Sequence, residues 1–310
     1  MIKEKVFDRI KGALYGVAVG DCLGALVEFR TWDEIRFQFG RVTEIGPSWL
    51  DGSIGKGTDD TAMTLAVAEG IMQTGPMDDP VEMIGAEFVK WFRRGPTGCG
   101  NICFRAIAGA SKNGKVSMPK REAWFKTAEA VHKALDGRSG GNGTLMRTAP
   151  VALLLQGTAR DKLAYEASKM THFDEDAADT CVLYCQLMTR LIRGEGVIAA
   201  VDHVISGTEY ERVTLPGAYF APNPSGYVKD TFIAALACFS HLKNFEDILV
   251  TVVGLGGDAD TTGAIAGGLA GAAYGYSSIP TRWIAALDDG LKARLDACAL
   301  AAGKVWKCWG

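Results

Sequence analysis

Apolar residues recur at helical spacing along most of this chain. Residues 4–20 carry apolar side chains three and four positions apart, beginning with Phe7 and Ile10, as in an amphipathic helix. Alternation of apolar and polar residues, which would indicate strands, is nearly absent. Similar stretches follow at 62–72, 81–92, 102–110, 121–135, 146–155, 159–171, 174–193, 228–241, 245–254, 264–274 and 281–302. The pattern predicts an all-α protein of about a dozen helices.

The stretches between these helices contain glycine and proline but do not resemble a domain linker. Residues 30–54 are mixed, 95–101 and 137–147 are rich in glycine, and 206–227 contains three prolines and is expected to be a loop. A chain of 310 residues can form one large domain or two small ones. Because no linker divides it, we expect residues 1–310 to form a single compact domain of orthogonally packed helices.

Composition and charge narrow the possible functions. Hydrophobic residues make up 48% of the chain and charged residues 22%, which is ordinary for a globular enzyme. A net charge of -3 gives no reason to expect a nucleic-acid or membrane partner. The charged start at Met1–Val6 does not resemble a signal peptide, and no uninterrupted apolar run of about 18 residues occurs. We therefore expect a cytoplasmic protein, acting as a monomer.

Two similar turns, about two hundred residues apart, each combine glycine with Asp and Thr before an apolar run. One is Gly256–Thr261, with the sequence Gly-Gly-Asp-Ala-Asp-Thr, and the other is Gly57–Thr61, with Gly-Thr-Asp-Asp-Thr. Asp and Thr are favoured at helix starts, so each turn could be a helix cap. A cap needs only one such residue, however, and each turn has several. The second interpretation is that both turns belong to one functional site.

A site built from both turns would concentrate negative charge. Asp59, Asp60, Asp258 and Asp260 would converge, and Glu28 could add a fifth carboxylate. Buried carboxylates in contact repel one another, which raises their pKa values or destabilises the fold. Two divalent cations would remove this repulsion. Because every candidate ligand is an oxygen atom, Mg²⁺ or Mn²⁺ is favoured over Zn²⁺.

Further candidates lie between the two turns. The loop Gly140–Gly143 could bring backbone N–H groups close to an anion, or it could be an ordinary loop. Arg147 could bind a phosphate or pair with a helix end. Among the histidines only His172, at a helix junction, is kept as a site candidate. No Ser or Cys occurs in a nucleophile-elbow context, which argues against triad chemistry.

Taken together, the motifs resemble the ADP-ribosylglycohydrolase family, which includes the dinitrogenase-reductase-activating glycohydrolases. They occur in the order of the family and extend from residue 12 to residue 276. The motifs are Gly12–Gly16, Gly20-Asp21, Gly24-Ala25, Gly57–Thr61, Gly141–Gly143 with Arg147, and Gly257–Thr261. The resemblance implies an all-α fold around a central dinuclear Mg²⁺ or Mn²⁺ site. It also implies hydrolysis of the bond between C1″ of ADP-ribose and an acceptor, with ADP-ribose as product.

The resemblance also implies roles for individual residues. The implied metal ligands are Thr58, Asp59, Asp60, Asp258, Asp260 and Thr261. The implied substrate-binding residues are Gly100, Asn101, Gly141, Asn142, Gly143, Arg147 and His172. Proton transfer would fall to Glu28, Asp59 or Asp60, with Glu28 close to the metals.

One departure from the family pattern concerns the acceptor side. Many members have an Asp where this chain has Gly98, and hydroxyl residues where it has Ile102 and Cys103. The expected substrate is ADP-ribosyl-arginine on a protein. The alternatives are another acceptor (serine-linked ADP-ribose, O-acetyl-ADP-ribose or a small molecule) or a non-catalytic ADP-ribose-binding module. An unrelated Mg²⁺-dependent phosphohydrolase is a further alternative.

Overall fold

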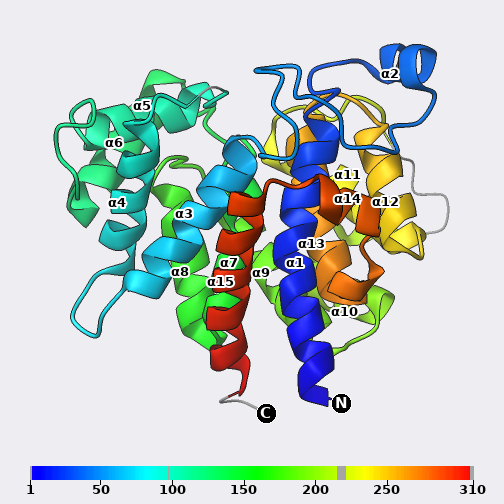
Figure 1. The fold of residues 1–310 in the computed structure, drawn as a ribbon. Coiled ribbons are helices and arrows are strands. Elements are labelled where there is room, and N and C mark those ends of the chain that lie inside the picture. The colour runs from blue at the N-terminus through cyan, green and yellow to red at the C-terminus, as the bar shows by residue number, and fades with distance from the viewer. Residues whose placement is uncertain (1, 97, 215–220, 308–310) are drawn as a thin grey trace.

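Helices form nearly all the regular structure of the computed structural model, which describes residues 2–96, 98–214 and 221–307 (Figure 1). These residues contain fifteen α-helices, three short 3-10 helices and no strand. The α-helices are α1 (Ile2–Gly24), α2 (Trp32–Phe39), α3 (Asp59–Gln73), α4 (Pro80–Phe92), α5 (Asn101–Ala110), α6 (Arg121–Ala134), α7 (Ala149–Leu154), α8 (Gly157–Lys169), α9 (Glu175–Arg193), α10 (Val197–Ile205), α11 (Val228–His241), α12 (Phe245–Val253), α13 (Ala259–Tyr274), α14 (Thr281–Ala286) and α15 (Asp289–Lys307). The 3-10 helices are η1 (Leu145–Arg147), η2 (Glu211–Thr214) and η3 (Tyr276–Ser278). The prediction of an all-α protein is confirmed.

The structure differs from the sequence prediction at several helix boundaries. Helix α2 lies in the stretch 30–54, where no helix was predicted, and begins with a capping box between Thr31 and Glu34. The single helix expected at 281–302 is two helices, and the amide of Asp288 between them donates to the carbonyl of Gly55. The expected loop at 206–227 contains η2, and its residues 215–220 lie outside the described part of the chain.

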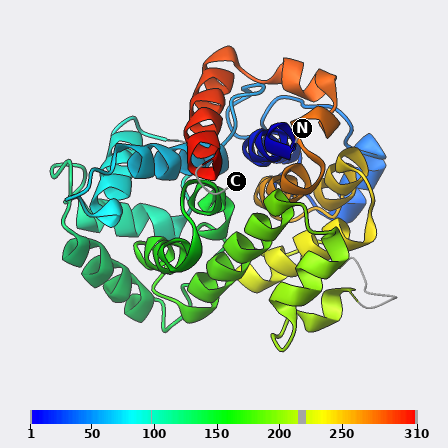
Figure 2. The same ribbon diagram turned by 90° about the horizontal axis from the view of Figure 1, so that it is seen from below.

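The centre of the molecule is a pair of helices, α1 and α13, that lie side by side (Figures 1 and 2). Their contact is made by backbone, because glycine recurs every fourth residue on both helices. A Cβ at Gly16 would lie 2.0 Å from the carbonyl oxygen of Gly267, and one at Gly267 would lie 2.1 Å from that of Gly16. The same close approach occurs between Gly12 and Gly271 and between Gly20 and Gly263. No side chain fits between the helices at these three glycine pairs.

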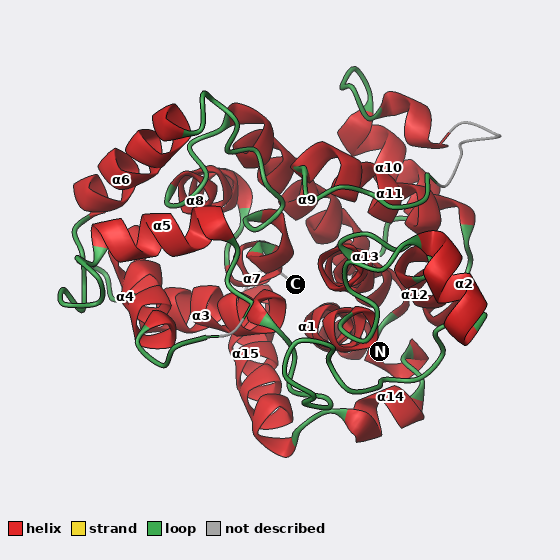
Figure 3. Ribbon diagram, turned by 90° about the horizontal axis from the view of Figure 1, so that it is seen from above, coloured by secondary structure: helices red, strands yellow, loops and turns green. Residues whose placement is uncertain are grey.

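The packing of α1 against α13 determines which connecting segments meet at the end of the two helices. Gly24, at the C-terminal end of α1, packs against the first residues of α13. The segment after α1 and the turn before α13 therefore meet at one end of the molecule. Figure 3 shows the loops gathered over this end, around α1 and α13. The N-terminus of α3 joins them there, because the amide of Thr58 donates to the carboxylate of Asp21 in α1.

The apolar run of α13 is the core of this fold. Residues 259–272 are all buried, and α1, α9, α11 and α12 pack around the helix. A helix that is apolar on every side is expected inside a large domain. Among the described residues, no helix is long and apolar enough to cross a membrane.

Candidate functional site

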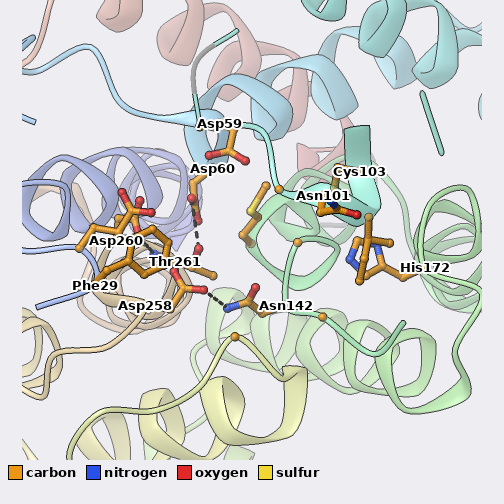
Figure 4. Close-up of a pocket in the computed structure, with 18 residues that line it drawn as sticks. Phe29, Asp59, Asp60, Asn101, Cys103, Asn142, His172, Asp258, Asp260 and Thr261 are labelled. Atoms are coloured by element: carbon orange, nitrogen blue, oxygen red, sulfur yellow. Dashed lines mark hydrogen bonds between the residues drawn. The ribbon is translucent and has the colours of Figure 1, made fainter. Parts of the chain in front are cut away.

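The two Gly-Asp-Thr turns meet, as the sequence predicted. Thr58 is the N-cap of α3, and Asp258 is the N-cap of α13. The hydroxyl of Thr261 donates to Oδ2 of Asp60 over 3.2 Å (Figure 4). The hydroxyl of Thr58 lies 3.5 Å from Oδ2 of Asp260. Each turn therefore supplies a hydroxyl that contacts a carboxylate of the other turn.

Glycine shapes the turn before α13. Gly256 and Gly257 have φ values of +77° and +67°, in the left-handed region that glycine adopts at little cost. The turn is also tied to the segment after α1: the amide of Phe29 donates to the carbonyl of Gly257 over 2.8 Å, and the amide of Gly257 donates to the carbonyl of Arg30 over 2.9 Å. Glu28 is consequently held beside the aspartates of α13.

The carboxylates of the two turns and of Glu28 line one cavity of about 260 Å³. Oxygen atoms of Glu28, Asp258 and Asp260 lie within 4.8 Å of one another. Burial, then the charges of Asp21 and Glu28, raises the pKa of Asp59 to about 8. Burial and neighbouring carboxylates also raise the pKa values of Asp60 and Asp260 well above the usual range. The protein without a counter-ion therefore holds its acids in an unfavourable environment.

Asp21 is a member of this cluster to which the sequence interpretation gave no role, although Gly20-Asp21 is one of the motifs. Its side chain is fully buried, and its carboxylate accepts hydrogen bonds from the amide of Thr58 at 2.9 Å and the amide of Thr61 at 3.0 Å, and from the hydroxyl of Thr61. These hydrogen bonds hold the first turn of α3 against α1. The sequence interpretation ended the first helix near Gly20. The sequence feature that could have identified Asp21 is an acid between Gly20 and the apolar Cys22, on the inner face of a helix that continues to Gly24.

The donor set fits divalent cations. Five acids line the cavity, and no lysine or arginine is among the described residues that do so. Oδ1 of Asp60 is buried and has no hydrogen-bond partner within the described part of the protein. A buried acceptor without a partner is costly, and a metal ion is one of the few groups that can satisfy it. Carboxylate and hydroxyl oxygens are the ligands that Mg²⁺ and Mn²⁺ prefer.

The wall opposite the carboxylates consists of glycines and a helix N-terminus. Gly141 and Gly143 line the cavity together with Gly100, the N-cap of α5, which has no capping side chain. Asn101, at the first position of α5, lines the same wall. Unpaired amides at a helix N-terminus attract anions. The loop is fixed by hydrogen bonds from Asn142 N to Gly226 O and from Val228 N to Gly140 O, both 2.9 Å long.

His172 lines this wall, and its protonation follows from its neighbours. Arg147 Nη2 donates to Thr171 Oγ1 over 2.7 Å, and Thr171 Oγ1 lies 2.8 Å from His172 Nδ1. Arginine has no acceptor, so the single hydroxyl proton of Thr171 is available to Nδ1. Burial and the charge of Arg147 lower the pKa of His172 to about 3, so the ring is neutral. With Thr171 as the donor to Nδ1, the proton of the neutral ring is on Nε2. Nε2 faces Gly141 and Gly143.

The side chains of Arg147 and Asn142 are hydrogen-bonded to other parts of the protein rather than left free to contact a substrate. Arg147 is buried beneath the loop, where it donates to Gly143 O at 2.9 Å and stacks on Phe88, and it does not line the cavity. The suggestion that it contacts a phosphate directly does not fit this position. The amide of Asn142 donates to Oδ2 of Asp258 at 2.9 Å and to Thr231 Oγ1 at 3.0 Å. It connects the glycine loop to the carboxylates.

Comparison with known proteins defines the class to which this fold and site belong. The sequence model of the ADP-ribosylglycohydrolase family matches residues 2–308, and the chain belongs to this family. The ADP-ribosyl-[dinitrogen reductase] glycohydrolase of Rhodospirillum rubrum is 33% identical over 98% of this chain and 99% of that protein. The ADP-ribosylarginine hydrolase Tri1 of Pseudomonas putida is 30% identical over 91% of this chain and 74% of that protein.

A solved structure gives the same result. An ADP-ribosylglycohydrolase-related protein complex contains a chain with a TM-score of 0.77 and 32% identity, covering 97% of this chain and 99% of that one. The fold and the family therefore agree. The protein is an enzyme, an ADP-ribosyl glycohydrolase, and the family resemblance inferred from the sequence is confirmed.

Proposed function

We propose that this enzyme hydrolyses the bond between C1″ of ADP-ribose and a guanidinium nitrogen of arginine on a modified protein, using two Mg²⁺ or Mn²⁺ ions. The observation that carries the proposal is the cavity, in which five carboxylates without a cationic side chain face a wall of glycines and a helix N-terminus. The arginine acceptor is supported by the Tri1 relatives, whose names specify ADP-ribosylarginine.

The metal ions would be held by oxygen atoms from both turns. The proposed ligands are Thr58, Asp59, Asp60, Asp258, Asp260 and Thr261. Divalent ions bound there would act as Lewis acids and as a template for the ribose and the attacking water. The carboxylate of Asp21 supports this arrangement, because it fixes the amides of Thr58 and Thr61 from the side away from the cavity.

The diphosphate of ADP-ribose would lie against the glycine wall. The amides around Gly141 and Gly143 and the N-terminus of α5 offer N–H donors without a competing side chain. His172 would add the donor Nε2–H. Arg147 would act indirectly, by holding the loop carbonyl of Gly143 and orienting Thr171.

In the reaction, the oxygen of water bonds to C1″ as the bond from C1″ to the guanidinium nitrogen breaks. A carboxylate takes the proton that water loses, and the departing nitrogen gains a proton and leaves as arginine. Glu28, Asp59 and Asp60 are the candidates for this transfer. Glu28 and Asp59 are only half-buried and face the cavity, whereas Asp60 is fully buried.

One observation favours a second acceptor. Gly98 lines the cavity with a φ of +81°, and a Cβ there would lie 2.7 Å from Leu50 Cδ2. The aspartate that many family members have at this position would be strained here. An acceptor side without this aspartate leaves serine-linked ADP-ribose and O-acetyl-ADP-ribose as the alternative substrates.

The test is a hydrolysis assay that follows free ADP-ribose. ADP-ribosyl-arginine, an ADP-ribosyl-serine peptide and O-acetyl-ADP-ribose are each incubated with Mg²⁺, with Mn²⁺ and with EDTA. We expect metal-dependent release that is fastest from ADP-ribosyl-arginine. Faster release from either of the other substrates would contradict the arginine assignment, and equal release in EDTA would contradict the metal requirement.

A further inference from the structure

Two large aromatic rings stand exposed beside the carboxylates. The side chain of Phe29 is 67% exposed and that of Trp49 is 49% exposed. Their ring centroids are 5.9 Å apart at an interplanar angle of 74°, an edge-to-face contact. Phe29 lines the cavity, and Figure 4 shows it next to Asp260, at the end opposite His172. Exposed aromatic residues grouped at a cavity mark a binding surface.

The backbone holds Phe29 at this position at a cost. Its φ is +61°, in the left-handed region that a bulky residue rarely adopts. The conformation is maintained by the hydrogen bond from its amide to Gly257 O, in the turn that carries Asp258. Strain of this kind persists only where the surroundings impose it, and it is common at functional sites.

Trp49 contacts the carboxylate cluster through Glu28. Its indole Nε1 donates to Oε2 of Glu28 over 2.7 Å, and its backbone amide donates to Ala25 O over 3.0 Å. The indole therefore fixes one oxygen of Glu28, and the same indole makes the edge-to-face contact with Phe29. Within this aromatic pair, Phe29 lines the cavity and Trp49 orients a carboxylate that also lines it.

The order of the residues along the cavity indicates a function for Phe29 and Trp49. The glycine wall and His172, which would bind the diphosphate, lie at one end, and Phe29 lies at the other, beyond the carboxylates (Figure 4). A group attached to C1″ of a ribose held at the carboxylates would consequently leave past Phe29. A guanidinium is planar and weakly hydrated, so it stacks well on aromatic faces.

We propose that Phe29 and Trp49 form the acceptor site, with Phe29 binding the guanidinium of the target arginine and Trp49 acting as a positioning residue for Glu28. This inference rests on the proposed ADP-ribosyl hydrolase activity and specifies how the acceptor is selected. A hydroxyl or ester acceptor has no planar cation and gains nothing from the aromatic faces.

The first test replaces Phe29 with Leu, which keeps an apolar side chain but removes the π face. We expect KM for ADP-ribosyl-arginine to rise about three- to tenfold, the size of a cation–π contact. The affinity for free ADP-ribose, which lacks the acceptor, should stay within twofold. The matched control is Phe37→Leu, since Phe37 is 92% exposed and does not line the cavity. A loss of ADP-ribose affinity in Phe29→Leu would assign the ring to the nucleotide and overturn the proposal.

The second test separates the two roles with Trp49→Phe, which keeps an aromatic face and removes the indole N–H. We expect kcat to fall about tenfold, with KM for ADP-ribosyl-arginine within twofold. The fall is smaller than the roughly hundredfold or greater loss of a whole general acid or base, because Glu28 is kept and only its orientation is loosened. An unchanged kcat would overturn the positioning role of Trp49. If kcat is unchanged and KM rises as it does in Phe29→Leu, Trp49 supports the acceptor site and does not position Glu28.

The failure of this inference can be told apart from the failure of the proposed function. If the wild-type enzyme releases no ADP-ribose from ADP-ribosyl-arginine, the proposed function fails. In that case calorimetry compares the binding of arginine amide to wild-type protein and to Phe29→Leu, with ADP-ribose and Mn²⁺ present. Tighter binding to the wild type supports the acceptor site, and equal binding overturns it.

Discussion

Asp260, a proposed metal ligand, shows how a buried carboxylate can be unfavourable in the metal-free fold. Its side chain is fully buried, its Oδ1 accepts from the amide of Thr261 at 2.9 Å, and no lysine or arginine is among the described residues that line the cavity with it. Burial and the charges of Asp60 and Glu28 raise its pKa well above the usual range. Such a group is destabilising unless a metal ion accompanies it.

We therefore predict opposite effects of Asp260→Asn on activity and on stability. The rate of ADP-ribose release should fall about a thousandfold, because Asn lacks the negative charge and one of the two carboxylate oxygens of the proposed metal ligand. The melting temperature in EDTA should rise, because a repulsive charge is removed. Hydrolysis assays and thermal melts measure the two effects, with the exposed Asp136→Asn as control. Turnover at the normal rate would disprove the metal assignment.

A second prediction concerns the proton on His172. If the hydroxyl of Thr171 donates to Nδ1, the proton of the ring is on Nε2, facing the cavity. Thr171→Val removes both hydrogen bonds of this hydroxyl at nearly constant volume, whereas Thr171→Ser retains them. We expect ¹⁵N NMR to show protonated Nε2 in wild type and Thr171→Ser, and a mixture of tautomers in Thr171→Val.

The affinity of Thr171→Val for ADP-ribose should fall about tenfold, comparable to one lost hydrogen bond to a charged group. The serine variant should keep the wild-type affinity. If the valine variant had the wild-type tautomer and affinity, the hydroxyl would have no positioning role.

At the scale of elements, the contact between α1 and α13 determines the site geometry. The two helices touch through backbone, so any side chain at Gly16 or Gly267 would push them apart. Asp21 lies on α1, and Asp260 lies on α13. The distance between them therefore depends on glycines that are far from the cavity.

We predict that Gly267→Ala destabilises the protein, although alanine is the better helix former by about 1 kcal/mol. The added Cβ would lie 2.1 Å from Gly16 O, and overpacking of this kind costs about 3 kcal/mol. Urea unfolding measures this loss, and calorimetry with Mn²⁺ should show weaker binding as the turns separate. Gly196→Ala is the control, because nothing lies within 4 Å of a Cβ there. Unchanged stability of Gly267→Ala would refute the close backbone contact.

At the scale of the whole molecule, we expect the carboxylate cluster to make stability depend on pH and, through the proposed metal ions, on metal concentration. The pKa of Asp59 is raised to about 8 in the folded protein, and in an unfolded chain it is near 3.8. The folded state therefore binds more protons between these values, and its stability falls as the pH rises through 8. His172 acts in the opposite direction, since its lowered pKa of about 3 costs stability only below pH 6.5.

Between pH 6.5 and 8 the carboxylates alone should therefore decide the trend. We predict that the melting temperature in EDTA falls across this interval and that saturating Mg²⁺ or Mn²⁺ reduces or reverses the fall. A thermal melt at each pH, with and without metal, provides the measurement. A melting temperature in EDTA that stays constant or rises across the interval would show that the cluster is not protonated as inferred.

The sequence alone determined the helical class, the two turns and the family. Helical spacing is a local property, and Asp and Thr beside glycine before an apolar run mark a helix start wherever the chain later goes. The convergence of Asp60 and Asp260 could be inferred because two similar acidic turns in one chain are hard to explain separately. Helix α2 was missed, because its capping box lies in a stretch without clear periodicity.

Only the tertiary structure decided which side chains meet. Asp21 belongs to the cluster because α1 continues to Gly24 and packs against α13, which no local pattern specifies. Arg147 lies beneath the glycine loop because Thr171, in a distant segment, accepts its hydrogen bond. The link from Trp49 to Glu28 likewise depends on how a loop folds back over the end of α1. Local sequence sets helices and turns through short-range sterics and hydrogen bonds, whereas the contacts that define the site depend on the packing of the whole chain.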